Sequence, residues 1–424
     1  MYLNRLALPR YRRRVLLRLT DLEKRVDLSL IACAVALAGV GIALIYSTGQ
    51  GPLAASRAGL YFKQLTWLGT GLVLLSVAAA LPLRIYDGFA KIMYLVSIVL
   101  LVAVLVAGEA RFGARRWIDL GGVLFQPSEF AKVGAILFLA RILSNRRTDW
   151  TRFRSLTLPV VVALVPVALI FKEPDLGTGF SLIAVLFGML YWAGVPALNL
   201  AVLLLPVASM LCSFWGWVWL IFFGVQWLIL HRSRLSVAHY VFVMIANGVL
   251  GTATNKVWHS LEEYQKERII SFLSSGVDRM GAGYQAVQSK IAIGSGNIIG
   301  KGFLNGTQKS LAFLPQQHTD FVFAVLGEEF GFVGCCVAVA LYAVIVWKGI
   351  SIAARARSRF AGLMCAGIVS LLLYHVGVNI LMTLGLAPVT GLPLPFLSYG
   401  GSALVVSLAA VGVMAGIAGR LHEY

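Results

Sequence analysis

The chain changes from polar to apolar sequence within the stretch FLPQQHTDFVF, residues 313–323. A long polar segment precedes this stretch, and an apolar run long enough to cross a bilayer follows it. His318, Thr319 and Asp320 stand side by side at the boundary. A carboxylate at the edge of a bilayer is costly unless it is hydrated or paired, so Asp320 indicates a functional position at the membrane surface.

Apolar runs recur along the rest of the chain. Of the 424 residues, 59% are hydrophobic and 13% are charged, whereas a soluble domain carries roughly 25% charged residues. Runs of about 20 apolar residues predict an all-α polytopic membrane protein with about twelve transmembrane segments. These segments cover approximately residues 28–48, 61–81, 88–108, 127–144, 156–171, 176–193, 197–212, 214–230, 236–252, 320–347, 361–384 and 401–418.

The predicted segments form one membrane domain, residues 28–424, preceded by a basic tail at residues 1–27. One long polar stretch, residues 253–318, interrupts this domain. A loop of this length inside a compact protein is usually functional. The five cysteines all fall in apolar runs and lack CxxC spacing, which favours buried apolar side chains over a disulfide or a metal site.

The net charge of +18 would suggest nucleic acid as a partner of a soluble protein. Here short basic segments at 145–155, 231–234 and 348–359 lie between apolar runs, so membrane topology and anionic lipid explain the charge without nucleic acid. With the N-terminus in the cytoplasm, all three segments lie inside. Both termini are then cytoplasmic, and residues 253–318 form a long extracytoplasmic loop.

Asp320 is the first candidate site residue. At the water–bilayer boundary it can act as a general base toward a hydroxyl, or bind a divalent cation through its carboxylate. The alternative is a structural role as a helix N-cap, because Asp commonly precedes a helix. His318 is expected to be a hydrogen-bonding neighbour of this carboxylate.

Glu129 and Lys132 are the second candidate. They are three residues apart on a helix predicted to start at Pro127, so they share one face. A local ion pair would explain how the two charges are tolerated but not why they are placed in a membrane span, which favours a cavity-lining role. Asp175, in the corner at 173–179, precedes another predicted helix, where an N-cap and a functional role are both compatible with the sequence.

Two further segments carry candidate residues. The glycine-rich stretch 281–306 contains Lys290, and its backbone amides and ammonium groups could approach a phosphate, although an ordinary irregular loop explains it as well. It matches neither a P-loop nor a dinucleotide fingerprint. The run 393–402 predicts a rigid turn in which Ser398 allows close backbone approach.

Six motifs follow one another along most of the chain. They are GARRWIDLG (113–121), QPSEFAK (126–132), PDLGT (174–178), GAGYQ with QSK (281–285, 288–290), LP with HTDF (314–315, 318–321), and PLP with SYGGS (393–395, 398–402). In content and order they resemble the SEDS (shape, elongation, division, sporulation) family. Residues 305–309 and 327–331 are similar to its elongation branch, represented by RodA, rather than its division branch, represented by FtsW.

The resemblance implies a SEDS-type helical bundle in the bacterial cytoplasmic membrane. It further implies a peptidoglycan glycosyltransferase that polymerises lipid II at the outer face of the membrane during cell elongation. The family's catalytic Asp falls on Asp320, and its cavity residues fall on Glu129, Lys132 and Asp175. The implied cofactor is a divalent cation, Mg²⁺ or Mn²⁺, bound by Asp320. The implied partner is a class B penicillin-binding protein, a transpeptidase of the elongation machinery.

In the implied reaction, a GlcNAc 4-hydroxyl attacks the anomeric carbon of a lipid-linked glycan, and undecaprenyl pyrophosphate leaves. Asp320 would accept the proton or position the cation, while Lys132, Arg115 or Arg116 would stabilise the pyrophosphate charge. Trp117 is interpreted as an interfacial anchor, with stacking on a sugar as the alternative.

Two features depart from the family pattern. Gln316 stands where the family often has Glu. Ten spans are usual, so residues 213–252 are predicted to be an added helical hairpin, and an even number of added spans leaves the following loop on the same face. The alternative functions are a lipid II flippase, an FtsW-type division polymerase and a scaffold for a transpeptidase. Polar positions at the outer face rather than the midplane argue against the flippase.

Overall fold

The computed structural model describes most of the chain. The described residues are 27–50, 59–111, 114–119, 121, 124–232, 237–260, 266, 270, 282–307 and 316–420. Of the predicted basic tail at 1–27, only Asp27 is among them. The predicted extracytoplasmic loop at 253–318 is described only in part.

A helix occupies each of the twelve predicted apolar runs. They are α2 (Leu28–Thr48), α4 (Leu60–Ala80), α5 (Leu83–Ala107), α6 (Pro127–Leu143), α7 (Thr157–Lys172), α8 (Leu176–Trp192), α9 (Ala197–Cys212), α10 (Gly216–Arg232), α11 (Val237–Ser260), α15 (Val322–Arg355), α16 (Arg359–Thr383) and α17 (Gly401–Gly419). Within the described ranges, seven segments are long and apolar enough to cross a membrane; they are α2, α4, α5, α7 with the preceding turn at 153–156, α15, α16 and α17. The helical membrane fold is therefore confirmed, and the remaining helices are shorter or less apolar.

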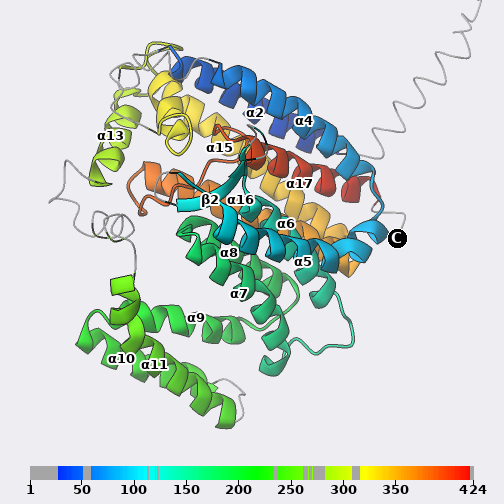
Figure 1. Ribbon diagram of the computed structural model, residues 1–424, viewed down its shortest axis with the longest axis vertical. Helices are drawn as coiled ribbons and strands as arrows, with labels where there is room; N and C mark the ends of the chain where they lie inside the picture. Colours follow the sequence, from blue (N-terminus) through cyan, green and yellow to red (C-terminus); the bar gives the residue numbers. More distant parts are fainter. Residues whose placement is uncertain are drawn as a thin grey trace, which may run out of the picture.

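Most helices pack into one bundle, with α16 at its centre (Figure 1). The apolar window of α16 is 61% buried, the largest share among the seven long segments. Its neighbours include α6, α8 and α15. Its polar residues His375, Asn379 and Thr383 are buried in protein, which makes this helix a suitable support for a polar site.

Small residues bring α17 against α4. A Cβ at Gly412 would lie 2.3 Å from the carbonyl oxygen of Leu75, and a Cβ at Gly416 would lie 2.4 Å from that of Ala79. Two glycines four residues apart let the helix backbones touch, as in small-xxx-small pairs of membrane helices. These two helices form one wall of the cavity described below.

Helix α15 is broken at Gly331, whose backbone has φ 63° and ψ −161°. The segment 297–302 lies against the break and replaces the lost helical hydrogen bonds. Four backbone hydrogen bonds join this segment to α15. They run from Lys301 N to Glu328 O (3.0 Å), Gly302 N to Glu329 O (3.0 Å), Phe332 N to Asn297 O (2.9 Å) and Val333 N to Ile298 O (3.1 Å). Broken helices persist in membranes when neighbouring protein satisfies the freed backbone groups in this way.

The structure differs from expectation in two details of the confirmed helical fold. Between α5 and α6, β1 (Glu109–Arg111), β2 (Ala114–Asp119) and β3 (Leu124–Phe125) form a small antiparallel sheet. The predicted loop at 253–318 also begins too early. Helix α11 continues to Ser260, and α13 (Ala282–Ser295) occupies part of the segment. The periodicity of apolar residues predicted neither strand β2, which contains two arginines, nor the polar C-terminal end of α11.

Helices α9, α10 and α11 lie at one end of the molecule, apart from the main bundle (Figure 1). They share a core of their own, formed by Val202, Leu205, Phe222, Leu230 and Val243. The hairpin predicted at 213–252 is thus observed as two helices, with the second one longer. Its status as an addition to the family pattern stays a prediction.

Candidate functional site

The first turn of α6 carries a buried ion pair. Pro127 occupies the first helical turn, where its missing N–H costs nothing. Glu129 Oε1 lies 2.7 Å from Lys132 Nζ, and the side chains are 7% and 2% exposed. Lys132 Nζ also lies 3.4 Å from Nε2 of His375, on α16. A full charge pair so deeply buried is retained by direct contact and by additional hydrogen bonding.

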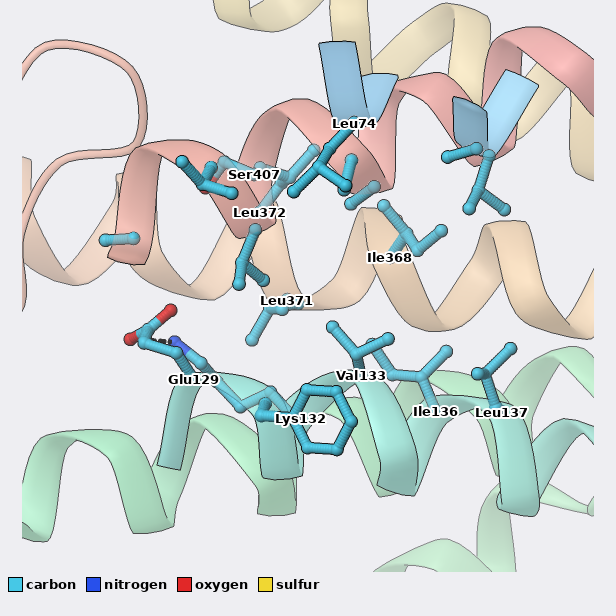
Figure 2. Close-up of a pocket in the computed structure, with 18 of the residues that line it drawn as sticks. Leu74, Glu129, Lys132, Val133, Ile136, Leu137, Ile368, Leu371, Leu372 and Ser407 are labelled. Atoms are coloured by element: carbon cyan, nitrogen blue, oxygen red, sulfur yellow. Dashed lines mark hydrogen bonds and ion pairs between the residues drawn. The ribbon is translucent and has the colours of Figure 1, made fainter. Parts of the chain in front are cut away.

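This pair forms one end of a cavity of about 360 Å³ between α4, α5, α6, α16 and α17. Figure 2 shows Glu129 and Lys132 together at one end, with Val133, Ile136 and Leu137 following along α6. Beyond the charged end, the lining is almost wholly apolar. The cavity therefore suits a molecule with a long apolar part and a charged head.

Asp175 caps the N-terminus of α8. Its carboxylate accepts hydrogen bonds from the backbone N–H (3.2 Å) and the hydroxyl (2.9 Å) of Thr178. The N-cap alternative is thus confirmed for this residue. A Cβ at Gly177 would lie 2.8 Å from Leu392 Cγ and 3.1 Å from the carbonyl oxygen of Thr390. The capped end of α8 therefore packs directly on the loop that leads to Pro393.

Arg116 connects the small sheet to this corner. From β2, its guanidinium donates to the backbone carbonyls of Glu173 (3.0 Å) and Pro174. Glu173 itself is 0% exposed, and burial, followed by the charge of Asp175, raises its pKa to about 8 against a lowering effect of Arg116. Sequence analysis passed over Glu173 because nothing local distinguishes a buried carboxyl from an exposed one.

Asp320 lies in the turn that precedes α15. Its backbone N–H donates to the carbonyl of Gln316 (3.1 Å), and its backbone carbonyl accepts from the side-chain amide of Asn379 (3.0 Å). The N-cap of α15 is Phe321, and no side chain caps this helix end. Asp320 is therefore not the N-cap of α15, and the residue is partly exposed.

Ser398 joins this turn to the loop before α17. Its hydroxyl donates to the carbonyl of Thr319 (2.5 Å) and accepts from the N–H of Leu394 (2.8 Å). The N–H of Tyr399 donates to the carbonyl of His318 (2.9 Å). Ser398 thus links the backbone of the Asp320 turn to that of the loop before α17. This agrees with its predicted place in a rigid turn. The His318 ring lies 5.8 Å from that of Tyr399, centroid to centroid.

The other predicted residues lie around this centre. Lys290, on α13, rests against the end of α16, where a Cβ at Gly385 would lie 2.0 Å from its Cε. Trp117 is partly buried on β2, opposite Glu109. Arg115 belongs to the same strand, and its side chain lies outside the described part of the structure. The structure therefore brings Glu129 and Lys132 together and holds the Asp320 turn through Ser398, whereas Lys290 lies against Gly385.

The residues present fit a divalent cation only in a limited way. Among the described residues, no three side chains of His, Cys, Asp or Glu gather as a metal-binding group. Asp320 thus offers one carboxylate rather than a protein cage. Mg²⁺ commonly binds through one or two carboxylates together with substrate phosphates, so a single carboxylate fits a cation brought to the site with a phosphorylated substrate.

Sequence analysis also missed His375 and Asn379. Both are buried on α16 and both contact the site. A usable signal existed: two hydrogen-bonding side chains four residues apart in an otherwise apolar span share one helix face and imply a polar neighbour.

Comparison with known proteins identifies the family. The family model described as cell cycle protein, FtsW/RodA/SpoVE, matches residues 27–223 and 209–423. The peptidoglycan glycosyltransferase MrdB of Escherichia coli K12 is 38% identical over 360 residues, which cover 85% of each chain. The peptidoglycan glycosyltransferase RodA of Treponema pallidum is 32% identical and covers 93% of this chain and 98% of its own.

Solved structures agree with the sequence relatives. A chain of a peptidoglycan synthase complex that coordinates polymerization and crosslinking superimposes with a TM-score of 0.69 at 29% identity, covering 94% of this chain and 99% of its own. Thermus thermophilus RodA superimposes with a TM-score of 0.62 at 26% identity, covering 94% and 98%. The chain therefore belongs to the FtsW/RodA/SpoVE family, the SEDS proteins, and is a RodA-like member of it.

Proposed function

We propose that the protein is a peptidoglycan glycosyltransferase that polymerises lipid II into glycan strands during cell elongation. Relatives that carry this activity in their names match 85% or more of the chain. The structural observation that supports it best is the cavity with a charged end and an apolar body. Lipid II has the same division, because a pyrophosphate joins its sugars to a long isoprenoid.

The apolar part of the cavity is assigned to the isoprenoid chain. Its walls come from five helices, and branched aliphatic side chains such as Ile136, Ile368 and Leu372 contribute much of the lining. Burying an isoprenoid there removes apolar surface on both partners from contact with lipid or water without leaving any polar group unpaired. The charged end, at Glu129 and Lys132, then faces the pyrophosphate.

The reaction forms one bond and breaks one. The 4-hydroxyl oxygen of a GlcNAc forms a bond to the anomeric carbon of the second glycan, whose bond to pyrophosphate oxygen breaks with its electron pair. Asp320 accepts the hydroxyl proton as general base. Lys132 and Arg116, with Arg115 as a further candidate, stabilise the charge that develops on the leaving pyrophosphate.

A divalent cation, Mg²⁺ or Mn²⁺, is part of the proposal. When bound, it would offset negative charge on the pyrophosphate. As the alternative to its role as general base, Asp320 would hold the cation together with the phosphate oxygens of the substrate. Chelation is therefore expected to lower the polymerisation rate of the wild-type protein, and added Mg²⁺ or Mn²⁺ to restore it.

The protein is also proposed to work with a partner in a defined membrane. The partner is a class B penicillin-binding protein of the elongation machinery, which would crosslink the strands. The structural relative from a complex that coordinates polymerization and crosslinking supports this choice. The membrane is the bacterial cytoplasmic membrane, with both termini inside and the polar site facing out, as the distribution of basic segments predicts.

Polymerisation of labelled lipid II by the purified protein tests the function. Wild type, alone or with its transpeptidase partner, should form glycan polymer, and Asp320→Asn should slow the reaction by about a hundredfold or more. Transport of lipid II across vesicles without polymer would indicate the flippase. Retention of polymerisation by a well-folded Asp320→Asn protein would show that the base is another residue.

A further inference from the structure

Helix α16 carries two buried polar side chains, of which one contacts Lys132 and the other contacts the Asp320 turn. His375 and Asn379 are four residues apart, so they lie on one face of the helix. They are 5% and 0% exposed. Both side chains are buried, so exposure to solvent does not explain their polarity. Each instead makes polar contacts with other segments of the chain.

Asn379 holds the backbone of the Asp320 turn. Its side-chain nitrogen donates to the carbonyl of Asp320 (3.0 Å) and to the carbonyl of Leu392 (2.7 Å). Only the NH₂ group of an amide can donate twice, so the two carbonyls fix the orientation of this side chain. Through it, the Asp320 turn and the loop before α17 are tied to the same point on α16.

His375 contacts the side-chain ammonium group of Lys132. Lys132 Nζ lies 3.4 Å from its Nε2, and an ammonium group can only donate. Nε2 must therefore be the unprotonated acceptor, which leaves the ring proton on Nδ1.

Asn379 thus contacts the Asp320 turn and His375 contacts Lys132, so each side chain reaches one proposed catalytic group. We propose that His375 and Asn379 are positioning residues that fix the Lys132 ammonium and the Asp320 turn relative to one another. This inference rests on the proposed polymerase function. It predicts that loss of either contact slows the chemical step more than it weakens binding of lipid II, because the aligned geometry matters most in the transition state.

Two substitutions at one position separate this role from a structural one. In His375→Asn, the shorter side chain leaves no acceptor at the place of Nε2 toward Lys132. In His375→Gln, the longer side chain brings an amide oxygen to the place of Nε2. Asn379→Asp keeps the side-chain shape and removes both donations. Ser370→Ala is the matched control, since the Ser370 hydroxyl donates to Ala366 within the same helix.

The test is the steady-state kinetics of lipid II polymerisation, with thermal unfolding in detergent as the check on folding. We expect His375→Asn and Asn379→Asp to lower kcat about 10- to 100-fold with KM changed less than about twofold. His375→Gln should recover most of the loss, and Ser370→Ala should match wild type. The inference is overturned if His375→Asn, well folded, keeps kcat within about twofold of wild type, or if His375→Gln is no better than His375→Asn.

A second readout does not depend on turnover. In ¹⁵N spectra of histidine-labelled protein, His375 should show an unprotonated Nε2 whose resonance moves in Lys132→Met. An unmoved resonance overturns the inference even if the protein polymerises lipid II. A moved resonance in a protein without polymerase activity supports the positioning contact and contradicts the proposed function instead.

Discussion

Lys132 and Glu129 are in direct contact inside the cavity wall. With the ammonium 2.7 Å from the carboxylate and both side chains almost fully buried, each charge is the main compensation for the other. Removing one partner leaves the other buried and unpaired, which is far more costly than removing both.

Lys132→Met is therefore expected to lower the free energy of unfolding by roughly 3–5 kcal/mol. The double substitution Glu129→Gln with Lys132→Met should regain most of that loss, because no uncompensated charge remains. Polymerisation should stay low in the single and the double variant, since both lack the Lys132 ammonium group that is proposed to face the pyrophosphate. Unfolding in mild detergent and the polymerisation assay measure the two effects. A double variant that is as unstable as the single one would contradict this account of the pair.

Glu173 predicts a dependence of stability on pH. Burial, with the Asp175 charge next, raises its pKa from 4.5 to about 8. Between these values the folded protein holds a proton that the unfolded chain has released, so stability falls as pH rises and levels off above about 8. Relative to Glu173→Gln, wild type should lose roughly 1.4 kcal/mol per pH unit within that window. Unfolding free energies of both proteins from pH 4 to 9 would measure the difference, and parallel curves would refute it.

Single residues show where sequence analysis reached its limit. Glu129 and Lys132 were predictable because an (i, i+3) pair is written in the local sequence. His375 was not, since its contact with Lys132 joins positions 243 residues apart. The functional role of Asp320 stays a prediction, and its cap alternative could be dismissed only once the helix start at Val322 was known.

At the scale of elements, the break in α15 places the segment that leads to the site. Gly331 adopts φ 63°, which side-chain-bearing residues rarely tolerate. A Cβ there would also lie 2.4 Å from the N atom of Gly300 and 2.6 Å from the carbonyl oxygen of Ile298. The carboxylate of Glu328 adds a second attachment, accepting from Lys301 Nζ and from the N–H of Thr307, each at 2.8 Å.

Gly331→Ala is expected to destabilise the protein by at least roughly 1–3 kcal/mol, the usual cost of a strained backbone conformation. The docked segment should then become more sensitive to limited proteolysis, and polymerisation should fall because the Asp320 turn precedes the same helix. Gly377→Ala is the control, since a Cβ at that helical position meets nothing within 4 Å. Equal stability of the two variants would mean that the break at Gly331 carries no strain.

Helices and strands differed in how well the sequence predicted them. The run at 197–212 was predicted at its observed limits, because an apolar stretch between turn residues favours a helix, which satisfies its own backbone hydrogen bonds. The sheet at 109–125 was missed. Its strands are short and rich in charge, so neither apolar alternation nor length marked them, and their pairing is set by the ends of α5 and α6.

At the scale of the whole molecule, the unit formed by α9, α10 and α11 is separable from the site. Its core is distinct from the main core, and the cavity draws no residue from it. The hairpin at 213–252 adds an even number of membrane crossings, which leaves the chain that follows on its original face.

Deletion of residues 213–252 should therefore preserve both topology and catalysis. The junction would join the end of α9 to the last turns of α11, giving one helix in place of three. In a cysteine-free background, a cysteine at position 290 should react with an impermeant thiol reagent in intact cells, with or without the deletion. Polymerisation should stay within about threefold of the full chain, as expected when no contact to substrate changes. Loss of labelling would show that the hairpin determines topology.

The central claim is that this chain itself forms the glycosidic bond and that Asp320 takes the proton. The most direct test is polymerisation of labelled lipid II by purified wild type and Asp320→Asn in the same detergent, with matched thermal stability and with Mg²⁺ present. The account predicts glycan polymer from wild type and a rate lower by about a hundredfold or more from the variant. Equal polymerisation by the two proteins, or none by well-folded wild type in the presence of its transpeptidase partner, would contradict it.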